Sequence, residues 1–517
     1  MLEYRNISQC LEDIAKKYPD KLAVTDLEQT YTWSQMNSLT EFAARQISEK
    51  GIRKGSYVAL WMNNSVSWVV LFLALQRIGA VTVLLNTAYK WRELEATLSN
   101  CDVEYIFYSK NYKDSDHERT IRELNLEKLP TFKEAYLVPD EPIDIQENEY
   151  KFNSNIRMSE NDAQAVCSIL FTSGTTGVAR GAMLTHSNIV NNSKAIIERL
   201  GWTSDDRVCF SVPMYHCFGI TVGILGALHT GASIHIMRKF SSEAAFKNIE
   251  KYKCTIFNGV PTMFLAMKNS SKKANYDLSS LQGGLMAGSS IIPEEYKAIC
   301  QELGLKRLNT AFGQTESSPG ITVSCDGDTL EKRAYTSGKV LPDMEMRIAV
   351  NGEAVGVGQE GEIQTRGYHV MVGYYKMPDE TEKVLSKDGW LSTGDLGHID
   401  EEGYLHVTGR IKDIIVRGGE NISPVEIERV ICQIPGVASV KVVGVKAEVI
   451  QEEVVACIIW KDGYTMSEDE VRKIVGIQLS DYKVPRYVLS FNEFPMNSSG
   501  KILGKELSNI CYEKIFG

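Results

Sequence analysis

The chain has 517 residues, of which 43% are hydrophobic and 24% charged, with a formal net charge of −10 and a pI of about 5.5. A chain of this length exceeds what one hydrophobic core can organise, so we expect roughly two to four domains. The acidic balance gives no support to a nucleic-acid surface, but it is compatible with small anionic ligands held in a locally basic site.

Cysteine usage and the N-terminus bear on the compartment. The 11 cysteines are scattered, odd in number and free of C-x-x-C pairs, which disfavours a disulfide framework or a zinc site and favours a reducing compartment. Residues 1–6 lack the basic and apolar blocks of a signal peptide, and the most apolar segment, 66–75, is too short to span a bilayer. We therefore expect a cytoplasmic protein without an integral membrane segment.

Up to about Tyr150, helical and strand patterns alternate, which predicts a mostly parallel sheet covered on both faces. The helices expected here are 7–17, 34–50, 66–75 and 91–99, and the strands are a hairpin within 22–33, then 57–62, 80–85 and 103–108. The polar stretch 114–155 is expected to be a connector. A second alternating unit is expected to start with strand 165–170 and to reach residue 312, with a turn at 259–262.

The sequence pattern changes after Pro319. Alternating apolar residues and frequent glycines predict a small antiparallel unit to about Gly409, and a compact α+β pattern follows from Ile411. The predicted fold is therefore α/β: a large N-terminal domain (1–411) of two doubly wound, mostly parallel sheets plus a small antiparallel β unit, then a small mobile α+β C-terminal domain (412–517).

The stretch 171–181 is the richest in candidate chemistry. It lies between an expected strand and an expected helix, and its glycines allow close approach of backbone N–H groups to a ligand. The candidate phosphate-binding residues are Thr172, Ser173, Gly174, Thr175, Thr176, Gly177 and Arg180. Hydroxyls, glycines and a cation together favour a phosphate cradle over an ordinary surface turn, although no Gly-Lys-Ser/Thr closes a Walker loop.

Four charged residues stand at turns further along the chain. Glu316 is suited to a divalent cation, with a helix-dipole role as the alternative. Asp395 is suited to accept hydrogen bonds from sugar hydroxyls, with an Asx turn as the alternative. Arg410 belongs to a charge cluster that could be a solvated linker, and Lys501 stands in a tight turn near the C-terminus. Taken singly, none of these residues identifies a function.

Taken together, these stretches resemble the adenylate-forming superfamily, over roughly residues 31–505. The tracts 213–219 (Pro-Met-Tyr-His-Cys-Phe-Gly), 312–316 (Phe-Gly-Gln-Thr-Glu) and 412–422 (Lys-Asp-Ile-Ile-Val-Arg-Gly-Gly-Glu-Asn-Ile) are most similar to its acyl-CoA synthetase branch, and among these to medium-chain fatty acyl-CoA synthetases. The resemblance implies ATP- and Mg²⁺-dependent activation of a carboxylic acid to acyl-AMP and pyrophosphate, then transfer to CoA. Dimers are common among such enzymes, so a homodimer is an expectation that the resemblance brings.

The resemblance also implies residue roles. The loop 171–181 would hold the β- and γ-phosphates, Thr315 the α-phosphate and Glu316 the magnesium. The adenine pocket would be formed by Gly288, Ser289, Ser290, Phe312 and Gly313, and the ribose would be held by Asp395 and Arg410. Lys412 would be the hinge, and Lys501 would bridge the carboxylate and the phosphate. His216 would lie near the acyl carboxylate, and Gly418 and Gly419 would line the pantetheine tunnel. Two positions depart from the family: Ala179-Arg180 replaces Pro-Lys, from which we expect retained activity with altered ATP binding, and Phe312 replaces the more common Tyr.

The substrate is predicted from the tract around Tyr215. Amino-acid activators carry an acid after this aromatic residue to pair the substrate ammonium, and His216 stands there instead. The expected acyl wall is apolar, which suits an alkyl chain; it comprises Tyr215, Phe218, Gly219, Val260, Met263, Met286 and Gly313. We therefore expect a medium-chain fatty acid. The alternatives are a ligase for aryl or short acids, transfer to a carrier protein, a luciferase-like oxygenase, and a non-catalytic acyl- or nucleotide-binding protein.

Overall fold

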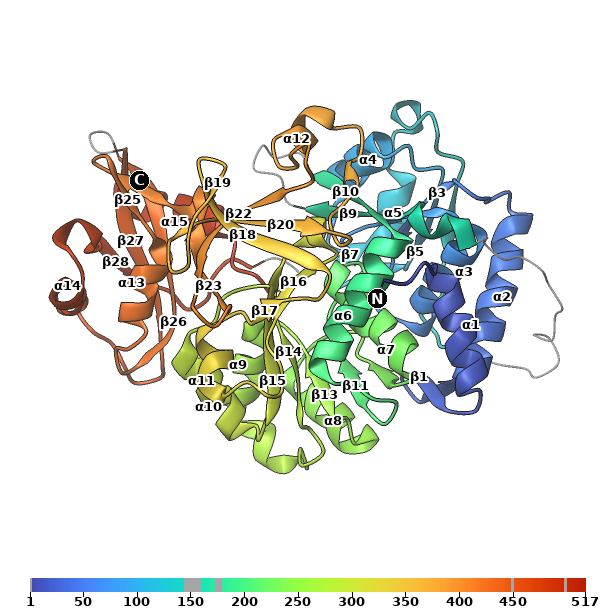
Figure 1. Ribbon diagram of the computed structural model, residues 1–517, viewed down its shortest axis with the longest axis horizontal. Helices are drawn as coiled ribbons and strands as arrows, with labels where there is room; N and C mark the ends of the chain where they lie inside the picture. Colours follow the sequence, from blue (N-terminus) through green and yellow to red (C-terminus); the bar gives the residue numbers. More distant parts are fainter. Residues whose placement is uncertain (1, 144–159, 173–178, 448–450, 497–499) are drawn as a thin grey trace.

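The computed structural model describes residues 2–143, 160–172, 179–447, 451–496 and 500–517, and Figure 1 shows their arrangement. Local signals set many helix ends. Helix α1 (Ile7–Lys17) begins after Asn6, whose side chain accepts the Gln9 N–H while Gln9 caps Asn6 in return, and α6 (His186–Leu200) begins after Thr185 in the same reciprocal way. Helix α6 ends at Gly201, which has φ 61°.

Two large, mostly parallel sheets make up the N-terminal part, as predicted. The first has the order β21-β10-β9-β4-β3-β5-β8. Its strands are β21 (Gly373–Tyr374), β10 (Arg180–Thr185), β9 (Val166–Thr172), β4 (Val81–Leu84), β3 (Tyr57–Trp61), β5 (Tyr105–Tyr108) and β8 (Glu134–Leu137). The second has the order β17-β16-β15-β14-β13-β11-β12-β1-β2. Its strands are β17 (Lys339–Val340), β16 (Gly320–Val323), β15 (Arg307–Gly313), β14 (Gly283–Met286), β13 (Ile256–Asn258), β11 (Arg207–Phe210), β12 (Ser233–Ile236), β1 (Leu22–Asp26) and β2 (Gln29–Thr32).

Helices fill the space between these sheets and cover their outer faces (Figure 1). The largest buried cluster joins residues of both sheets to α1, α2 (Trp33–Glu49), α3 (Val66–Ile78) and α7 (Leu225–Thr230). A second cluster packs α8 (Ser242–Tyr252), α9 (Pro261–Asn269) and α10 (Pro293–Glu302) on the nine-stranded sheet, and a third packs α4 (Trp91–Asn100) on the seven-stranded sheet. Short helices α5 (His117–Arg122), α11 (Leu330–Tyr335) and α12 (Pro378–Glu382) lie in connections.

The last third of the chain has two further sheets. An antiparallel sheet has the order β19-β18-β20-β22-β23, formed by β19 (Glu353–Ala354), β18 (Met344–Val350), β20 (Gly361–Gly367), β22 (Leu391–Ile399) and β23 (Leu405–Arg410). The C-terminal unit, orange to red at one end of Figure 1, has its own buried clusters. It comprises β24 (Ile415–Arg417), β25 (Glu420–Ile422), α13 (Pro424–Ile431), β26 (Val437–Ala447), β27 (Gln451–Trp460), α14 (Glu468–Gln478), β28 (Tyr487–Ser490) and α15 (Gly504–Phe516).

The structure corrects four predictions about elements. The loop after Thr172 joins two antiparallel strands, β9 and β10, rather than a strand and a helix, and β9 belongs to the first sheet because it pairs with β4. The hairpin β1–β2 lies in the second sheet. The predicted connector 114–155 contains β8, which pairs with β5. The predicted turn 259–262 already enters α9, since Pro261 occupies the first helical turn.

Within the described residues, none of the helices combines the length and the apolar character that crossing a membrane requires.

Candidate active site

Glu316 stands where three segments of the chain meet. The short helix Thr315–Ser317 follows β15 and places the Glu316 side chain in a buried position. The Thr172 hydroxyl at the end of β9 donates to Glu316 Oε1 over 3.4 Å, and the Tyr374 hydroxyl of β21 donates to the same oxygen over 2.6 Å. Among the described residues neither contact uses Oε2. Magnesium is commonly held by one or two carboxylates with substrate phosphates, so Glu316 fits this ion.

Arg180 lies directly across the hairpin from Thr172. Its guanidinium carbon is 4.6 Å from the centroid of the Tyr374 ring, a cation–π contact, and its Nη1 is 3.8 Å from Glu380 Oε2. Its buried Nε has no hydrogen-bond partner in the part of the chain that the structure describes. The predicted phosphate-loop cation is therefore held beside Glu316 with a donor still available.

Asp395 and Arg410 form a forked ion pair across neighbouring strands. Their backbones are in register between β22 and β23, and Arg410 donates through Nε to Oδ1 at 2.7 Å and through Nη2 to Oδ2 at 3.3 Å. Burial raises the pKa of Asp395 above its ordinary value, and the charge of Arg410 opposes that shift. A fixed acid–cation pair at this place fits the predicted ribose site.

Lys501 reaches this same region from the C-terminal unit. The Thr262 hydroxyl donates to the Gly500 carbonyl over 3.3 Å, and Val260 lies next to Gly500. Desolvation by surrounding protein, and then the positive charge of Arg410, lower the pKa of Lys501, while Asp395 opposes this shift. The residue nevertheless reaches solvent. Asp395, Arg410 and Lys501, predicted separately from the sequence, thus form one electrostatic cluster.

The predicted acyl-carboxylate residue, His216, lies between two anchored neighbours. The Tyr215 hydroxyl donates to Asn86 Oδ1 over 3.0 Å, and Cys217 Sγ lies 3.7 Å from Thr315 Oγ1. Burial lowers the pKa of His216 to about 4, and its Nε2 has no partner in the described segments. His216 is therefore neutral at pH 7 and can offer a hydrogen bond, but no charge.

The tract 213–219 leads into a π-helix, Phe218–Ile224, which continues as α7. Glycines allow this geometry. A Cβ on Gly219 would lie 2.3 Å from the Pro213 carbonyl oxygen, and one on Gly223 would lie 1.9 Å from the Phe210 ring. π-Helical turns often occur at functional sites, and this one follows Tyr215 and His216 directly.

The other predicted acyl-wall residues lie after the carboxyl ends of the central strands. Val260, Met263 and Met286 share one buried cluster, and Phe218 packs partly buried against two others. Gly313 is exposed, but a Cβ there would lie 1.8 Å from the Pro319 carbonyl oxygen. At Gly219 and Gly313 the missing side chain thus makes room for a carbonyl group.

The predicted adenine loop follows β14. Gly288, Ser289 and Ser290 are exposed, and Phe312 is half-buried. Gly288 has φ 94°, and a Cβ there would lie 3.2 Å from Val260 Cγ1. Val260 thus lies next to both Gly288 of the adenine loop and Gly500.

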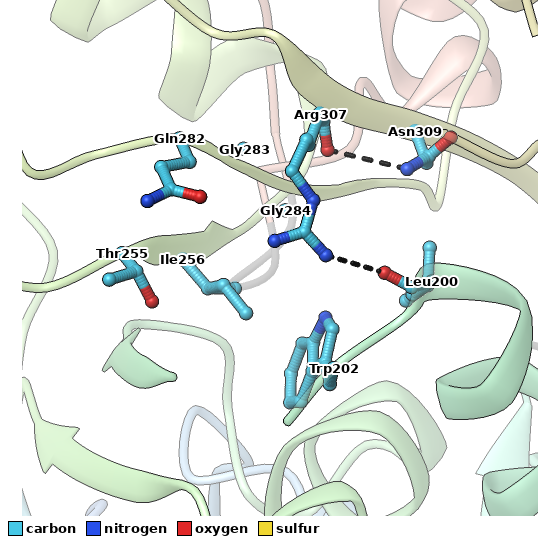
Figure 2. Close-up of a pocket in the computed structure, with 9 residues that line it drawn as sticks. All are labelled: Leu200, Trp202, Thr255, Ile256, Gln282, Gly283, Gly284, Arg307 and Asn309. Atoms are coloured by element: carbon cyan, nitrogen blue, oxygen red, sulfur yellow. Dashed lines mark hydrogen bonds between the residues drawn. The ribbon is translucent and has the colours of Figure 1, made fainter. Parts of the chain in front are cut away.

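A cavity at the opposite ends of the same strands is shown in Figure 2. Thr255 precedes β13, while Gly283 and Arg307 begin β14 and β15. The cavity volume is about 10 Å³, room for about one water molecule. In Figure 2 the Arg307 guanidinium reaches over it to the Leu200 carbonyl oxygen, a hydrogen bond of 3.1 Å. This cavity is too small, and on the wrong sheet edge, to be the acyl site.

The predicted hinge and pantetheine residues lie at the start of the C-terminal unit. Lys412 is in the exposed short helix Ile411–Asp413. Gly418 and Gly419 form the turn between β24 and β25 with φ of 60° and 90°, and a Cβ on either would meet nothing within 4 Å. The predicted phosphate-loop residues Ser173, Gly174, Thr175, Thr176 and Gly177 lie outside the described residues.

Sequence reasoning missed Tyr374, Asn86 and Cys217 as parts of this site. Tyr374 and Asn86 act on it only through the pairing of distant segments, and no local motif reports such pairing. Cys217 stood within the quoted 213–219 tract, but its contact with Thr315 depends on two sequence-distant loops.

Comparisons with known proteins agree with this geometry. Residues 11–375 match the family model described as AMP-binding enzyme, and residues 426–501 match the AMP-binding enzyme C-terminal domain. A putative acyl-CoA synthetase YngI of Bacillus subtilis (strain 168) is 38% identical over 97% of this chain and 96% of its own. The medium-chain acyl-CoA ligase ACSF2, mitochondrial, of Mus musculus is 34% identical over 96% of this chain and 86% of its own.

Among solved structures, MatB from Rhodopseudomonas palustris is 26% identical. Its ATP-bound form gives a TM-score of 0.86 and its apo form 0.76, each covering 99% of this chain and 100% of that chain. The chain therefore belongs to the AMP-binding enzyme family. Within that family it is of the acyl-CoA synthetase branch, an AMP-forming acid–CoA ligase whose cosubstrates are ATP and CoA and whose metal is Mg²⁺.

Proposed function

We propose that this ligase activates a medium-chain fatty acid and transfers it to CoA. The observation that carries the assignment of roles is the convergence of Glu316, the Asp395–Arg410 pair and Lys501 from four separate segments, since the charge of Arg410 acts on both Glu316 and Lys501. The apolar cluster of Val260, Met263 and Met286, and a neutral His216, support an uncharged alkyl tail. The relatives named medium-chain acyl-CoA ligases agree with this substrate.

In the first step a carboxylate oxygen of the acid attacks the α-phosphorus of ATP, and the bond to pyrophosphate breaks. The carboxylate is already ionised at pH 7, so no general base is needed. The chain must place the reactants in line and stabilise the growing negative charge. Lys501 would bridge carboxylate and α-phosphate, Thr315 would contact the α-phosphate, and Arg180 would stabilise the departing pyrophosphate. Magnesium held by Glu316 would add positive charge beside the phosphates.

In the second step the thiol sulfur of CoA attacks the acyl carbon and releases its proton to solvent, a thioester forms, and AMP leaves with the electron pair of the broken C–O bond. We propose that the C-terminal unit, residues 412–517, turns about Lys412, withdrawing Lys501 and bringing Gly418 and Gly419 to the acyl-adenylate. The Thr262–Gly500 contact favours the arrangement for the first step. The higher TM-score against ATP-bound than apo MatB supports the same interpretation.

Two rivals remain to be separated from this proposal: a ligase for aryl or short acids, and an enzyme that passes the acyl group to a carrier protein. ATP–pyrophosphate exchange with acids from C2 to C16 and aryl acids, followed by mass spectrometry of products with CoA or holo-carrier protein, distinguishes all three. We expect maximal exchange near C8 to C12 and acyl-CoA as the product. Maximal exchange with acetate or an aryl acid would reject the substrate.

The role of Lys501 is tested separately. Lys501→Ala should lower adenylate formation on the order of 10²- to 10³-fold, because one charge-stabilising donor is lost from the transition state, while ATP binding persists. Lys505→Ala, at an exposed lysine in the same C-terminal region, is the matched control. Unchanged exchange in Lys501→Ala would contradict the assignment.

We also propose a cytoplasmic location, supported by the 11 cysteines, all of which are unpaired thiols.

A further inference from the structure

Tyr374 links the two charged groups on the pyrophosphate side of the proposed site. Its hydroxyl donates to Glu316 Oε1 over 2.6 Å, and its ring lies 4.6 Å from the Arg180 guanidinium carbon. One side chain therefore touches the predicted metal ligand with its polar end and the predicted phosphate cation with its face.

The hydroxyl contact fixes the carboxylate. Glu316 is buried, and a buried carboxylate with one oxygen held by a donor cannot rotate freely. Among the described residues, Thr172 and Tyr374 both act on Oε1, and this leaves Oε2 as the oxygen available to a cation.

The ring contact accounts for the arginine in this chain. A planar guanidinium stacks on an aromatic face, which an ammonium does with less contact area. Among the described residues, the ion-pair partner of Arg180 is Glu380 at 3.8 Å, too far for a strong hydrogen bond. The Tyr374 ring thus holds Arg180 in place. A second close carboxylate in this role would instead compete with a phosphate for the guanidinium.

We propose that Tyr374 is a positioning residue that presents Glu316 to magnesium through its hydroxyl and Arg180 to the β- and γ-phosphates through its ring. The inference rests on the proposed roles of Glu316 and Arg180. Outer-sphere partners of metal ligands typically contribute about 10- to 100-fold to metal affinity, which sets the expected size of the effect.

The chain offers a matched control in the next residue. Tyr375 is the first residue after β21, and its side chain makes a separate set of contacts. Its hydroxyl donates to Asp102 Oδ2 over 2.9 Å, and its ring lies 5.3 Å from that of Tyr57. Tyr375→Phe removes a half-buried tyrosine hydroxyl that likewise donates to a carboxylate, without touching Glu316 or Arg180.

The experiment measures thermal stabilisation by Mg²⁺ at a fixed concentration of α,β-methylene-ATP, which needs no turnover, together with the KM for ATP in pyrophosphate exchange. Tyr374→Phe should raise the Mg²⁺ concentration for half-maximal stabilisation about tenfold and leave the KM for ATP at saturating Mg²⁺ within about twofold, since its ring persists. Tyr374→Leu should raise both quantities, and Arg180→Met should raise mainly the KM. Tyr375→Phe should change neither.

An unchanged Mg²⁺ midpoint in Tyr374→Phe, or an equal shift in Tyr375→Phe, would overturn the proposal. Failure of the proposed function has a different signature. In that case the wild-type protein would show no pyrophosphate exchange with any acid. The Glu316→Gln variant would then have the same Mg²⁺ concentration for half-maximal stabilisation as the wild type.

Discussion

Individual ionisable residues at the site are tuned in opposite directions by the same burial. Desolvation lowers the pKa of His216 to about 4 and also lowers that of Lys501, while it raises the pKa of Asp395. His216 therefore stays neutral through the physiological range. In the proposed mechanism Lys501 must carry its charge to bridge carboxylate and phosphate, so we expect its ionisation to limit the reaction at high pH.

A pH profile of pyrophosphate exchange tests this. Lys501 loses its proton as pH rises through a pKa below the ordinary 10.5, so the alkaline limb of kcat/KM should fall at a lower pH than a free lysine would give. Lys501→Arg keeps its charge to far higher pH, so its residual activity should lack this limb. His216→Gln should add no inflection to the pH profile between pH 5.5 and 7.5. This range extends roughly one unit either side of the ordinary histidine pKa. An identical alkaline limb in wild type and Lys501→Arg would rule out Lys501 as its source.

Among the elements of the proposed site, a turn whose glycines have positive φ provides open space. The β24–β25 turn is held open by Gly418 and Gly419, both at positive φ with free space where a side chain would point. That space is what a long thiol cofactor would need if this hairpin turned toward the adenylate.

Gly419→Leu should therefore block the second step and spare the first. We expect acyl-AMP and pyrophosphate to form within about twofold of wild type, and acyl-CoA formation to fall on the order of 100-fold, a loss typical of misplaced reactants. Gly463→Leu is the control, because Gly463 has φ 79° and an equally open environment in another turn of the same unit. A parallel loss in both variants would assign the effect to backbone strain.

Elements with strong local periodicity were predictable, and those defined by distant pairing were not. Helix 7–17 and strand 57–62 match α1 and β3 within a residue. The hydroxyl- and glycine-rich stretch after Thr172 looks alike whether a strand or a helix follows, so its hairpin with β10 was missed. Strand β8 has only four residues in a polar segment, too few for a periodicity signal. Helix α15 was not predicted, although it follows Lys501 closely.

The residues of the site likewise divide into those that a local motif predicts and those that depend on distant pairing. Glu316, Asp395, Arg410 and Lys501 could be proposed because each stands in a motif that the family shares, and the structure brings the last three into one electrostatic cluster. Tyr374 lies in none of the tracts on which the resemblance was based. Its role depends on β21 pairing with β10, a contact between residues almost two hundred positions apart that only the folded chain reveals.

At the scale of the whole molecule, the large N-terminal part and the C-terminal unit meet in the polar contact of Thr262 with Gly500. If the two reaction steps need different positions of the C-terminal unit, fixing this contact should separate them. A Cβ on Gly500 would lie 2.8 Å from Thr262 Oγ1, close enough for a disulfide between cysteines introduced at both positions. Gly500 has φ 82°, so a cysteine there costs about 1–2 kcal/mol of backbone strain.

We expect oxidised Thr262→Cys/Gly500→Cys protein to form acyl-AMP and pyrophosphate once, yet to make acyl-CoA at least tenfold more slowly, because the bond holds Lys501 in the adenylation position and keeps Gly419 away. Dithiothreitol should restore acyl-CoA formation. The two single variants, treated with the same oxidant, control for the native cysteines, all buried except the half-buried Cys325 and Cys432. Normal thioester turnover in the verified cross-linked protein would show that both steps proceed with the two units in one arrangement.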